Sequence, residues 1–357
     1  MIKLSSGNLL AAPAEALVNT VNTEGVMGKG IALQFKNMFP VMFKEYVDAC
    51  KVGAVKLGKM DLHHLSSIGD GPQWIVNFPT KGHWRAKSRI KDIEAGLESL
   101  VQDIQRLGIK SIAVPPLGCG NGGLEWSEVR PIIESAFAAI PEVEVLLYAP
   151  GSTPQAKDMP NRTERPKMTV AMATLVAMID RYRQALMDPF VTVLEAQKLM
   201  YFLQEAGENL KLNYTKHHFG PYAVNLRHVL NRMESHYLVG FGDGEDKPTK
   251  PLTLLENSRE LSARTLERNF DVQERMNRVS ELIDGFEDTF GMELLSTVHW
   301  VMCHVPDADS SSEVAVEAVQ SWNLRKSKTM RPIHIQKAWM HLRDHNWHRE
   351  SRSAQRQ

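Results

Sequence analysis

Short apolar runs alternate with longer amphipathic segments over the first 150 residues of the chain. Apolar runs of strand length lie at 1–4, 15–22, 54–65, 74–78, 111–115 and 143–150. Apolar positions at helical spacing lie at roughly 28–37, 40–50, 88–107 and 126–139. Mostly apolar strands that alternate with helices predict an α/β fold, namely a three-layer α/β/α domain around a mixed, mostly parallel sheet.

The pattern changes after residue 150. Residues 151–167 carry turn-forming and charged residues without an apolar period, which predicts a linker. From 168 onward apolar residues recur at helical spacing, for example in MTVAMATLVAMIDRYRQAL and SELIDGFEDTFGMELLSTVHWVM. We therefore expect one domain over 1–150 and a mainly α-helical domain over 168–357, with a short hairpin around 211–220 and 248–255.

Composition excludes several classes of protein. Forty-two acidic and 42 basic residues give a formal net charge of zero, so overall charge makes no case for binding nucleic acid or a membrane. Three scattered cysteines predict neither a disulfide framework nor a zinc site. The N-terminal stretch MIKLSSGNLL is unlike a signal peptide, and no run approaches membrane-spanning length. We expect a cytoplasmic protein.

Two glycine-rich loops are the most informative local features. One is PPLGCGNGGLEW at 115–126, and the other contains Gly25, Gly28 and Gly30 after the run that ends at Asn22. Each loop leads into a predicted helix, where backbone N–H groups suit a phosphate. Two such loops in one small domain predict a nucleotide sugar joined through a pyrophosphate. The sequence has neither a Walker lysine pattern nor the full dinucleotide-binding signature, which disfavours kinases and dehydrogenases.

Four side chains near these loops have two interpretations each. Asn8 either caps its own turn or binds an adenine edge. Asn22 either holds the end of a strand or binds a ribose hydroxyl. Lys81, in NFPTKGHWR, is either a surface charge or a desolvated nucleophile for an aldehyde-like sugar carbon. Cys119 is either a small residue that fits its loop or, with a base beside it, a nucleophile.

The phrases ALVNTVNTEGVMGKGIALQFK, NFPTKGHWR and PPLGCGNGGLEW together resemble the macrodomains, and within them the DarG-type antitoxins of DarT–DarG toxin–antitoxin systems. The resemblance covers residues 1–150. It implies a macrodomain that hydrolyses the N-glycosidic bond of ADP-ribosyl-thymidine in single-stranded DNA, with no cofactor and no metal. The implied partners are ADP-ribosylated single-stranded DNA, free ADP-ribose as product, and a cognate DarT-type ADP-ribosyltransferase toxin.

The same resemblance implies roles for individual positions. Lys81 would engage the anomeric carbon of the distal ribose, and Asn22 would act with it in catalysis. The implied ADP-ribose contacts are Asn8, Leu9, Asn19, Thr20, Val21, Asn22, Gly28, Gly30, Ile31, Ala32, Leu33, Gln34, Thr80, Pro116, Leu117, Gly118, Cys119, Gly120, Asn121 and Tyr148.

The sequence departs from the family pattern at two of these positions. Asn8 stands where many macrodomains have an Asp for the adenine amine, which leaves a neutral and weaker hydrogen bond. Asn121 stands where the human relative has a catalytic Asp. The missing carboxylate shifts the chemistry towards Lys81 or water, and Glu125 is the acid nearby in the sequence.

Residues 168–357 resemble, more loosely, the helical Panacea or SocA-like antitoxin domain, through EAQKLMYFLQEAG and HHFGPYAVNLRHVLNRM. This implies a toxin-neutralising role. Residues 271–320 contain eleven acidic and two basic residues, and 321–357 contain nine basic and two acidic residues. The acidic stretch is either a set of solvated helix faces or a mimic of a nucleic-acid backbone. The basic tail at 325–350, with two tryptophans, either contacts nucleic acid or packs as a final helix.

Two functions are therefore compared below. The first is a DNA ADP-ribosyl glycohydrolase that also neutralises a toxin by binding it. The second is a non-catalytic ADP-ribose-binding module fused to a toxin-sequestering helical domain. Lys81 distinguishes them, because binding alone does not require a lysine beside the distal ribose. The adjacent pairs His63–His64 and His217–His218 point to opposite faces of a strand and predict no metal site.

Overall fold

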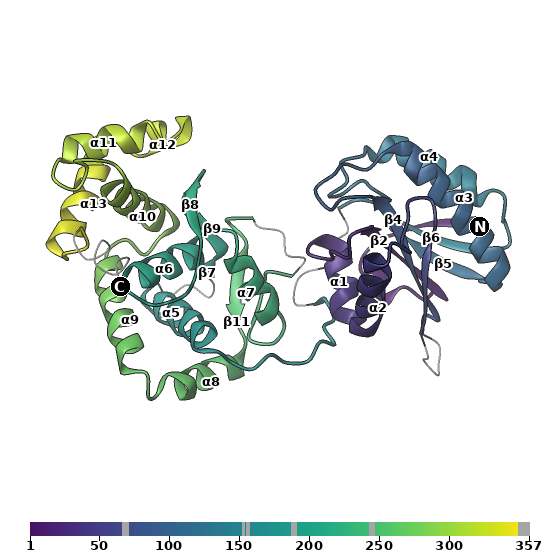
Figure 1. Cartoon of the computed structure of the whole chain (residues 1–357), viewed down its shortest axis with the longest axis horizontal. Helices are drawn as coiled ribbons and strands as arrows, with labels where there is room; N and C mark the ends of the chain where they lie inside the picture. Colours follow the sequence, from purple (N-terminus) through teal and green to yellow (C-terminus); the bar gives the residue numbers. More distant parts are fainter. Residues whose placement is uncertain (66–70, 152–153, 155–157, 187–190, 243–246, 349–357) are drawn as a thin grey trace. The chain divides into compact units, whose positions relative to one another are not determined.

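The computed structural model describes residues 1–65, 71–151, 154, 158–186, 191–242 and 247–348. Within these ranges the chain forms two compact units, the first over Met1–Glu164 and the second over Arg165–Phe241 and residues 247–348 (Figure 1). None of the described helices combines the length and apolar character needed to cross a membrane. Each unit is described by itself below.

The described strands of the first unit form one sheet in the order β1-β6-β5-β2-β4-β3. Their bounds are β1 (Ile2–Ser5), β2 (Ala16–Asn22), β3 (Asp61–His64), β4 (Trp74–Lys81), β5 (Ser111–Val114) and β6 (Glu144–Tyr148). β3 runs antiparallel to β4 and every other pair is parallel. This confirms the expected mixed, mostly parallel sheet.

One expected strand is much shorter than its apolar run. Of residues 54–65, only Asp61–His64 form a strand. Gly58 has a φ of +73°, and the Lys59 N–H donates to the Lys56 carbonyl at 3.3 Å, so a turn occupies the first half of the run.

Helices cover both faces of this sheet (Figure 1). Their bounds are α1 (Gly30–Met38), α2 (Pro40–Lys51), α3 (Ile90–Leu107) and α4 (Trp126–Phe137). Because neighbouring strand residues point to opposite faces, Leu17 packs with Phe35 on the α1–α2 side and Val18 packs with Leu97 on the α3–α4 side. The sheet is therefore buried on both faces, as a mostly parallel sheet requires.

The second unit is mainly helical, as expected from the sequence. Its described helices are α5 (Val170–Leu186), α6 (Val193–Glu205), α7 (Leu226–Met233), α8 (Glu256–Leu266), α9 (Phe270–Ile283), α10 (Thr289–His304), α11 (Ser312–Gln320), α12 (Leu324–Thr329) and α13 (Pro332–Asp344). Its described strands are β7 (Val191–Thr192), β8 (Tyr214–His217), β9 (Gly220–Ala223), β10 (Leu238–Val239) and β11 (Pro251–Leu254).

Two details of this unit differ from the sequence-based expectation. The segments 211–220 and 248–255 lie in separate sheets, because β8 pairs with β9 whereas β11 pairs with β7 and β10. The helical pattern over 280–302 is interrupted between α9 and α10. Gly285 has a φ of +79°, and the Asp288 side chain accepts a hydrogen bond from the Gly291 N–H at 2.6 Å, which starts a new helix.

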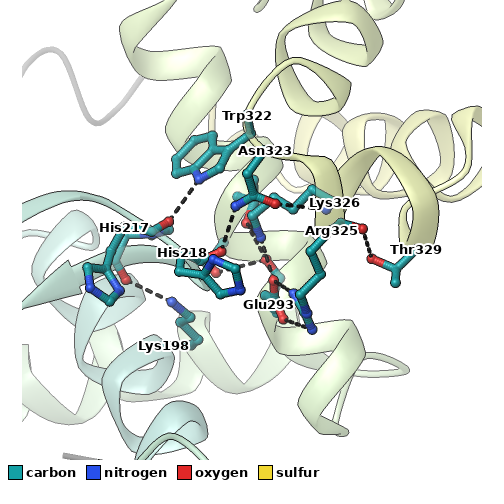
Figure 2. A network of polar contacts seen from close by, with 12 residues as sticks. Lys198, His217, His218, Glu293, Trp322, Asn323, Arg325, Lys326 and Thr329 are labelled. Carbon is teal, nitrogen blue, oxygen red and sulfur yellow. Dashed lines mark hydrogen bonds and ion pairs between the residues drawn. The ribbon is translucent and has the colours of Figure 1, made fainter.

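A polar network is buried between α10 and α12 (Figure 2). The Glu293 carboxylate accepts hydrogen bonds from the Lys326 ammonium at 2.5 Å and from the Arg325 guanidinium at 2.6 and 2.9 Å. Lys326 is 0% exposed and Glu293 is 1% exposed. Burial opposes ionisation of Glu293, but the two cations outweigh it and lower the pKa of the carboxyl. Glu293 therefore belongs to the core and to no acidic surface.

The described part of the basic tail packs against the same unit. Trp347 is 4% exposed and stacks edge-on against Phe202, with ring centroids 5.6 Å apart. The Trp339 indole N–H donates to the Ala308 carbonyl at 2.8 Å. The packed interpretation of the two tail tryptophans is therefore the one observed, and residues 349–350 of the tail lie outside the described residues.

Candidate functional site

The predicted site segments lie at the edge of the sheet where the parallel strands end. The register pairs Ser5 at the end of β1 with Tyr148 at the end of β6, and Asn22 at the end of β2 with Lys81 at the end of β4. The loop after β5 leaves the sheet at the same edge. Open α/β sheets bind ligands at this edge, because loops from several strands converge there.

Lys81 joins the segments. Its ammonium group donates a hydrogen bond to the Asn121 carbonyl at 3.0 Å. A Cβ placed on Gly30 would lie 3.3 Å from Asn121 Nδ2. The 115–126 loop therefore contacts the loop that contains Gly25, Gly28 and Gly30. Partial burial lowers the pKa of the Lys81 ammonium. The geometry thus brings one lysine and both glycine loops to a common point, and of the two sequence interpretations a fully solvated surface charge is the poorer fit.

The Asn22 side chain holds the loop that follows β2. Its amide N–H₂ donates to the Val26 carbonyl at 2.6 Å, and its Oδ1 accepts from the Glu24 and Val26 N–H groups at 2.9 and 3.3 Å. The Tyr46 hydroxyl also donates to the Asn22 carbonyl at 2.6 Å. Asn22 is 4% exposed. These hydrogen bonds show that Asn22 holds the conformation of the loop that contains Gly25, Gly28 and Gly30. Its catalytic role stays a prediction.

Asn19 belongs to a polar chain inside the sheet. Its amide donates to Asn77 Oδ1 at 2.9 Å, and the Asn77 amide donates to Asp61 Oδ2 at 2.9 Å. Asn19 and Asn77 are both 0% exposed. The chain links β2, β4 and β3 beneath the site. Sequence reasoning missed Asn77 and Asp61, although an amide in the otherwise apolar run WIVNF was the available signal.

The glycines of the 115–126 loop serve different purposes. A Cβ on Gly122 would lie 2.3 Å from Ser88 Oγ and 2.4 Å from the Gly118 carbonyl oxygen. A Cβ on Gly118 would lie 2.9 Å from Leu124 and 3.0 Å from Ser88. Both glycines therefore allow the loop to fold tightly on itself and on Ser88. Gly120 is exposed, and a Cβ there would meet nothing within 4 Å.

The remaining predicted ligand contacts range from buried to exposed. The buried ones are Leu9, Val21, Leu33, Gln34, Thr80, Leu117 and Tyr148. The partly exposed ones are Asn8, Thr20, Gly28, Ile31, Ala32, Pro116 and Cys119. The exposed ones are Gly120 and Asn121. Most of the exposed and partly exposed members come from both glycine loops and from the turn that contains Asn8, and Lys81 beside them is also partly exposed.

The structure bears on the two interpretations given above for Asn8 and for Cys119. Asn8 Oδ1 accepts a hydrogen bond from the Leu10 N–H at 3.0 Å, so this side chain caps its own turn. Burial raises the pKa of the Cys119 thiol to about 11, with Glu125 adding to the effect. A thiol with that pKa is protonated at neutral pH and is a poor nucleophile. Cys119 therefore fits the first of its two interpretations, a small residue within the loop.

One cluster of metal-ligand types occurs among the described residues, in the helical unit. Atoms of Glu205, His299 and Cys303 lie within 4.8 Å of one another. The two ring nitrogens of His299 already form hydrogen bonds, one with the Tyr201 hydroxyl at 2.8 Å and one with the Trp347 carbonyl at 3.2 Å. His299 is thus a core histidine with both nitrogens engaged.

The geometry agrees with comparisons to known proteins. Residues 18–133 match the Macro domain family. A DNA ADP-ribosyl glycohydrolase of Thermus aquaticus is 44% identical over 338 residues, which span 95% of this chain and 92% of that relative. This chain belongs to the DNA ADP-ribosyl glycohydrolase family. Membership of this family makes the chain an enzyme and confirms the hydrolase interpretation over the non-catalytic one.

Two further matches each cover 42% of this chain. The solved macrodomain of Mycobacterium tuberculosis DarG is 54% identical, with a TM-score of 0.42 and an alignment over 42% of this chain and 99% of that one. A DNA ADP-ribosyl transferase–DNA ADP-ribosyl glycohydrolase fusion protein of Thermosipho africanus is 39% identical over 163 residues, 42% of each chain. The predicted macrodomain and its membership of the DNA ADP-ribosyl glycohydrolases are confirmed by the family match and the Thermus aquaticus relative, whereas the Panacea or SocA-like assignment of the helical half stays a prediction.

Proposed function

We propose that this DNA ADP-ribosyl glycohydrolase releases ADP-ribose from thymidine in single-stranded DNA and that Lys81 acts at the sugar carbon attached to the base. The observation that carries the proposal is the Lys81 amine at the junction of both glycine loops, 3.0 Å from the Asn121 carbonyl. Backbone N–H groups of the two loops suit the diphosphate. A diphosphate held there leaves the distal ribose next to Lys81.

The reaction breaks the bond between the anomeric carbon and a base nitrogen. In the first step the neutral Lys81 amine bonds to the anomeric carbon as the bond to the base nitrogen breaks, and the base nitrogen takes up the proton that the amine loses. In the second step water replaces the Lys81 amine on the anomeric carbon, which releases ADP-ribose and restores the free lysine. Lys81 is the group beside this carbon, and its lowered pKa increases the fraction of neutral amine at a given pH. Asn121 supplies a carbonyl acceptor for the amine, and Asn22 supplies the loop conformation on the other side.

The experiment that tests this proposal compares the unaltered chain with Lys81→Ala and Lys81→Arg. The substrate is a single-stranded oligonucleotide ADP-ribosylated on thymidine, and the measurement is released ADP-ribose. We expect release by the unaltered chain and a loss of at least a hundredfold in both variants, since arginine keeps the charge but is not a nucleophile. Calorimetric titration with ADP-ribose should still show binding by Lys81→Ala. Full activity of Lys81→Arg would contradict a nucleophilic amine.

We further propose that the helical unit neutralises a cognate ADP-ribosyltransferase toxin by binding it. Two observations support this. The match to the Thermus aquaticus relative extends through the helical half, and the Thermosipho africanus relative joins a DNA ADP-ribosyl transferase to a DNA ADP-ribosyl glycohydrolase in one chain. A transferase and a glycohydrolase of opposite action are therefore paired in at least one relative.

Binding and hydrolysis are separable with one variant. Lys81→Ala in the full chain removes the proposed nucleophile and leaves the helical unit unchanged. Stoichiometric amounts of this variant should inhibit the purified transferase acting on a thymidine-containing oligonucleotide. If the variant leaves transferase activity intact while the unaltered chain removes the modification, protection comes from hydrolysis alone.

A further inference from the structure

The segment 81–91 concentrates positive charge beside the site. Five of its eleven residues are Lys or Arg and none is Asp or Glu, in a chain whose formal net charge is zero. The side chains of Arg85, Lys87, Arg89 and Lys91 are exposed. Within the described part of the chain, none of these four side chains forms an ion pair. The segment therefore carries four uncompensated cations on its surface.

An aromatic surface lies in the middle of this charge. Trp84 is 43% exposed, which is unusual for so large an apolar side chain. The His83 ring stacks on it with centroids 5.6 Å apart and planes 22° apart, and the Arg85 guanidinium lies 4.4 Å from the indole ring. Glu24 is the acidic neighbour, 3.5 Å from His83 Nε2. Flat rings flanked by cations are what single-stranded nucleic acids bind, because every base offers a face for stacking.

The segment is attached to the site at two points. It begins at Lys81, whose amine contacts Asn121. Further along, the Ser88 N–H donates to the Gly122 carbonyl at 3.0 Å, and the buried Ser88 side chain packs against Gly118 and Gly122. Trp84, Arg85, Lys87 and Arg89 therefore lie on a loop that is hydrogen-bonded to the 115–126 loop, and Lys91 follows in the first turn of α3. A polymer bound along it would pass directly by the reacting sugar.

We infer that residues 81–91 bind the DNA strand that carries the modified base, with Trp84 stacking on a neighbouring base and Arg85, Lys87 and Lys91 contacting phosphates. This inference rests on the proposed function. It gives the DNA strand a binding surface that is separate from the residues proposed to bind ADP-ribose. An acidic protein would satisfy the cations but would not need the exposed indole, so the aromatic surface favours a nucleic acid.

The first test removes two charges from the full chain in Lys87→Gln/Lys91→Gln. The matched control, Lys44→Gln/Lys110→Gln, also removes two exposed positive charges. Lys44 lies in α2, and Lys110 directly precedes β5, at the end of the parallel strands opposite the site. Fluorescence anisotropy measures binding of an unmodified single-stranded oligonucleotide over a range of salt concentrations. Each phosphate contact contributes about 0.7 to the slope of log affinity against log salt, so we expect the slope to fall by about 1.4 in the first variant and to stay unchanged in the control.

The second test concerns the indole. Trp84→Ala should weaken oligonucleotide binding by about tenfold, whereas Trp84→Phe, which keeps a stacking face, should restore most of the affinity. With ADP-ribosylated substrates, the Trp84→Ala variant should raise KM for the oligonucleotide and leave kcat nearly unchanged. Its effect on an ADP-ribosylated nucleoside, which has no flanking strand, should be less than twofold. Equal losses for Phe and Ala, or equal losses on both substrates, would assign Trp84 to loop structure and overturn the inference.

Failure of the inference is distinguishable from failure of the proposed function. If the unaltered chain releases ADP-ribose from the oligonucleotide but the charge variant and its control show the same KM and the same salt slope, the strand binds elsewhere. If the unaltered chain releases nothing, the proposed reaction is wrong, and the binding of the unmodified strand still decides the surface. If the cations instead affect only inhibition of the transferase, the surface belongs to a protein partner.

Discussion

Gly122 is a position where the loop tolerates no side chain. A Cβ there would lie 2.3 Å from Ser88 Oγ and 2.4 Å from the Gly118 carbonyl oxygen, which belongs to the backbone. We expect Gly122→Ala to lower the free energy of unfolding of the first unit by about 2 kcal/mol, the usual cost of overpacking, and to weaken ADP-ribose binding at least tenfold.

The neighbouring Gly120 provides the matched control for this prediction. It has open space around its Cα, and its φ lies outside the left-handed region. Gly120→Ala should therefore change the free energy of unfolding by less than about 0.5 kcal/mol. Chemical denaturation and calorimetric titration with ADP-ribose measure both variants. Similar losses in both would mean that loop entropy, and not packing against Ser88, requires the glycines.

The pH dependence of hydrolysis should report Lys81. Burial lowers the pKa of this ammonium, so the neutral amine becomes available at a lower pH than for a solvated lysine. If the neutral amine attacks the sugar, kcat rises with pH through this lowered pKa and then levels. A profile of single-turnover rates against pH checks this, and a rate that falls over the same interval would show that the charged ammonium is the active form. Borohydride reduction during turnover should then leave no sugar adduct on Lys81.

The sequence alone predicted which segments form the candidate site, but not the contacts that each side chain makes there. Lys81 and both glycine loops were recognisable from residue type and position. The hydrogen bonds that commit Asn22 to Val26 were not, because an asparagine at a strand end suits a ribose and a tight loop equally. Likewise, half of the glycine content of the 115–126 loop reflects packing against Ser88, a residue that lies 30 positions before Gly118.

Helix and strand boundaries were predictable where local chemistry marks them. The start of α10 is given by Asp288, whose side chain caps the first turn, and the end of α9 by Gly285 with its positive φ. Apolar periodicity runs across this boundary and conceals it. The pairing of β11 with β7 and β10 had no local signal at all, because β partners distant in sequence are selected by tertiary packing.

The contact between α10 and α12 gives a prediction for Glu293. In Glu293→Gln the Lys326 ammonium loses its buried counter-charge, and we expect the free energy of unfolding to fall by about 3–5 kcal/mol near neutral pH. Burial already lowers the pKa of Lys326 to about 8, and without Glu293 it falls further. The folded state of the variant then binds fewer protons than the unfolded state, so its deficit in stability shrinks as the pH rises.

Urea unfolding at several pH values measures this deficit. The double variant Glu293→Gln/Lys326→Met removes the stranded cation together with its partner and should recover part of the loss. A deficit that is independent of pH, with no recovery in the double variant, would show that the network matters for its shape and not for its charges.

The two units have separate cores, which predicts how the whole chain unfolds. The buried clusters of the first unit, around Leu17 and Val18, share no member with the cluster around Tyr201 in the second. We expect calorimetry to show two transitions. ADP-ribose at a hundred times its dissociation constant adds about 2.7 kcal/mol to the unit that binds it, which should raise one transition by about 5–10 °C.

Variants assign the transitions. At the same ADP-ribose concentration, a tenfold loss of affinity in Gly122→Ala should reduce the stabilisation by the ligand to about 1.4 kcal/mol, and Glu293→Gln should lower the other transition only. A single transition that both variants and the ligand shift together would mean that the units unfold as one body.

The contrast between Cys119 and Lys81 bears on chemical intervention. Inhibitors that form covalent bonds are usually directed at cysteine, but the Cys119 thiol has a pKa of about 11 and offers almost no thiolate at neutral pH. The Lys81 amine is shifted in the opposite direction, towards its reactive form. The usual order of reactivity between cysteine and lysine is thus reversed at these two positions of the candidate site. For covalent inhibition of this enzyme, an amine-selective electrophile is therefore better suited than a cysteine-directed one. An example is an aromatic aldehyde attached to an adenosine diphosphate scaffold.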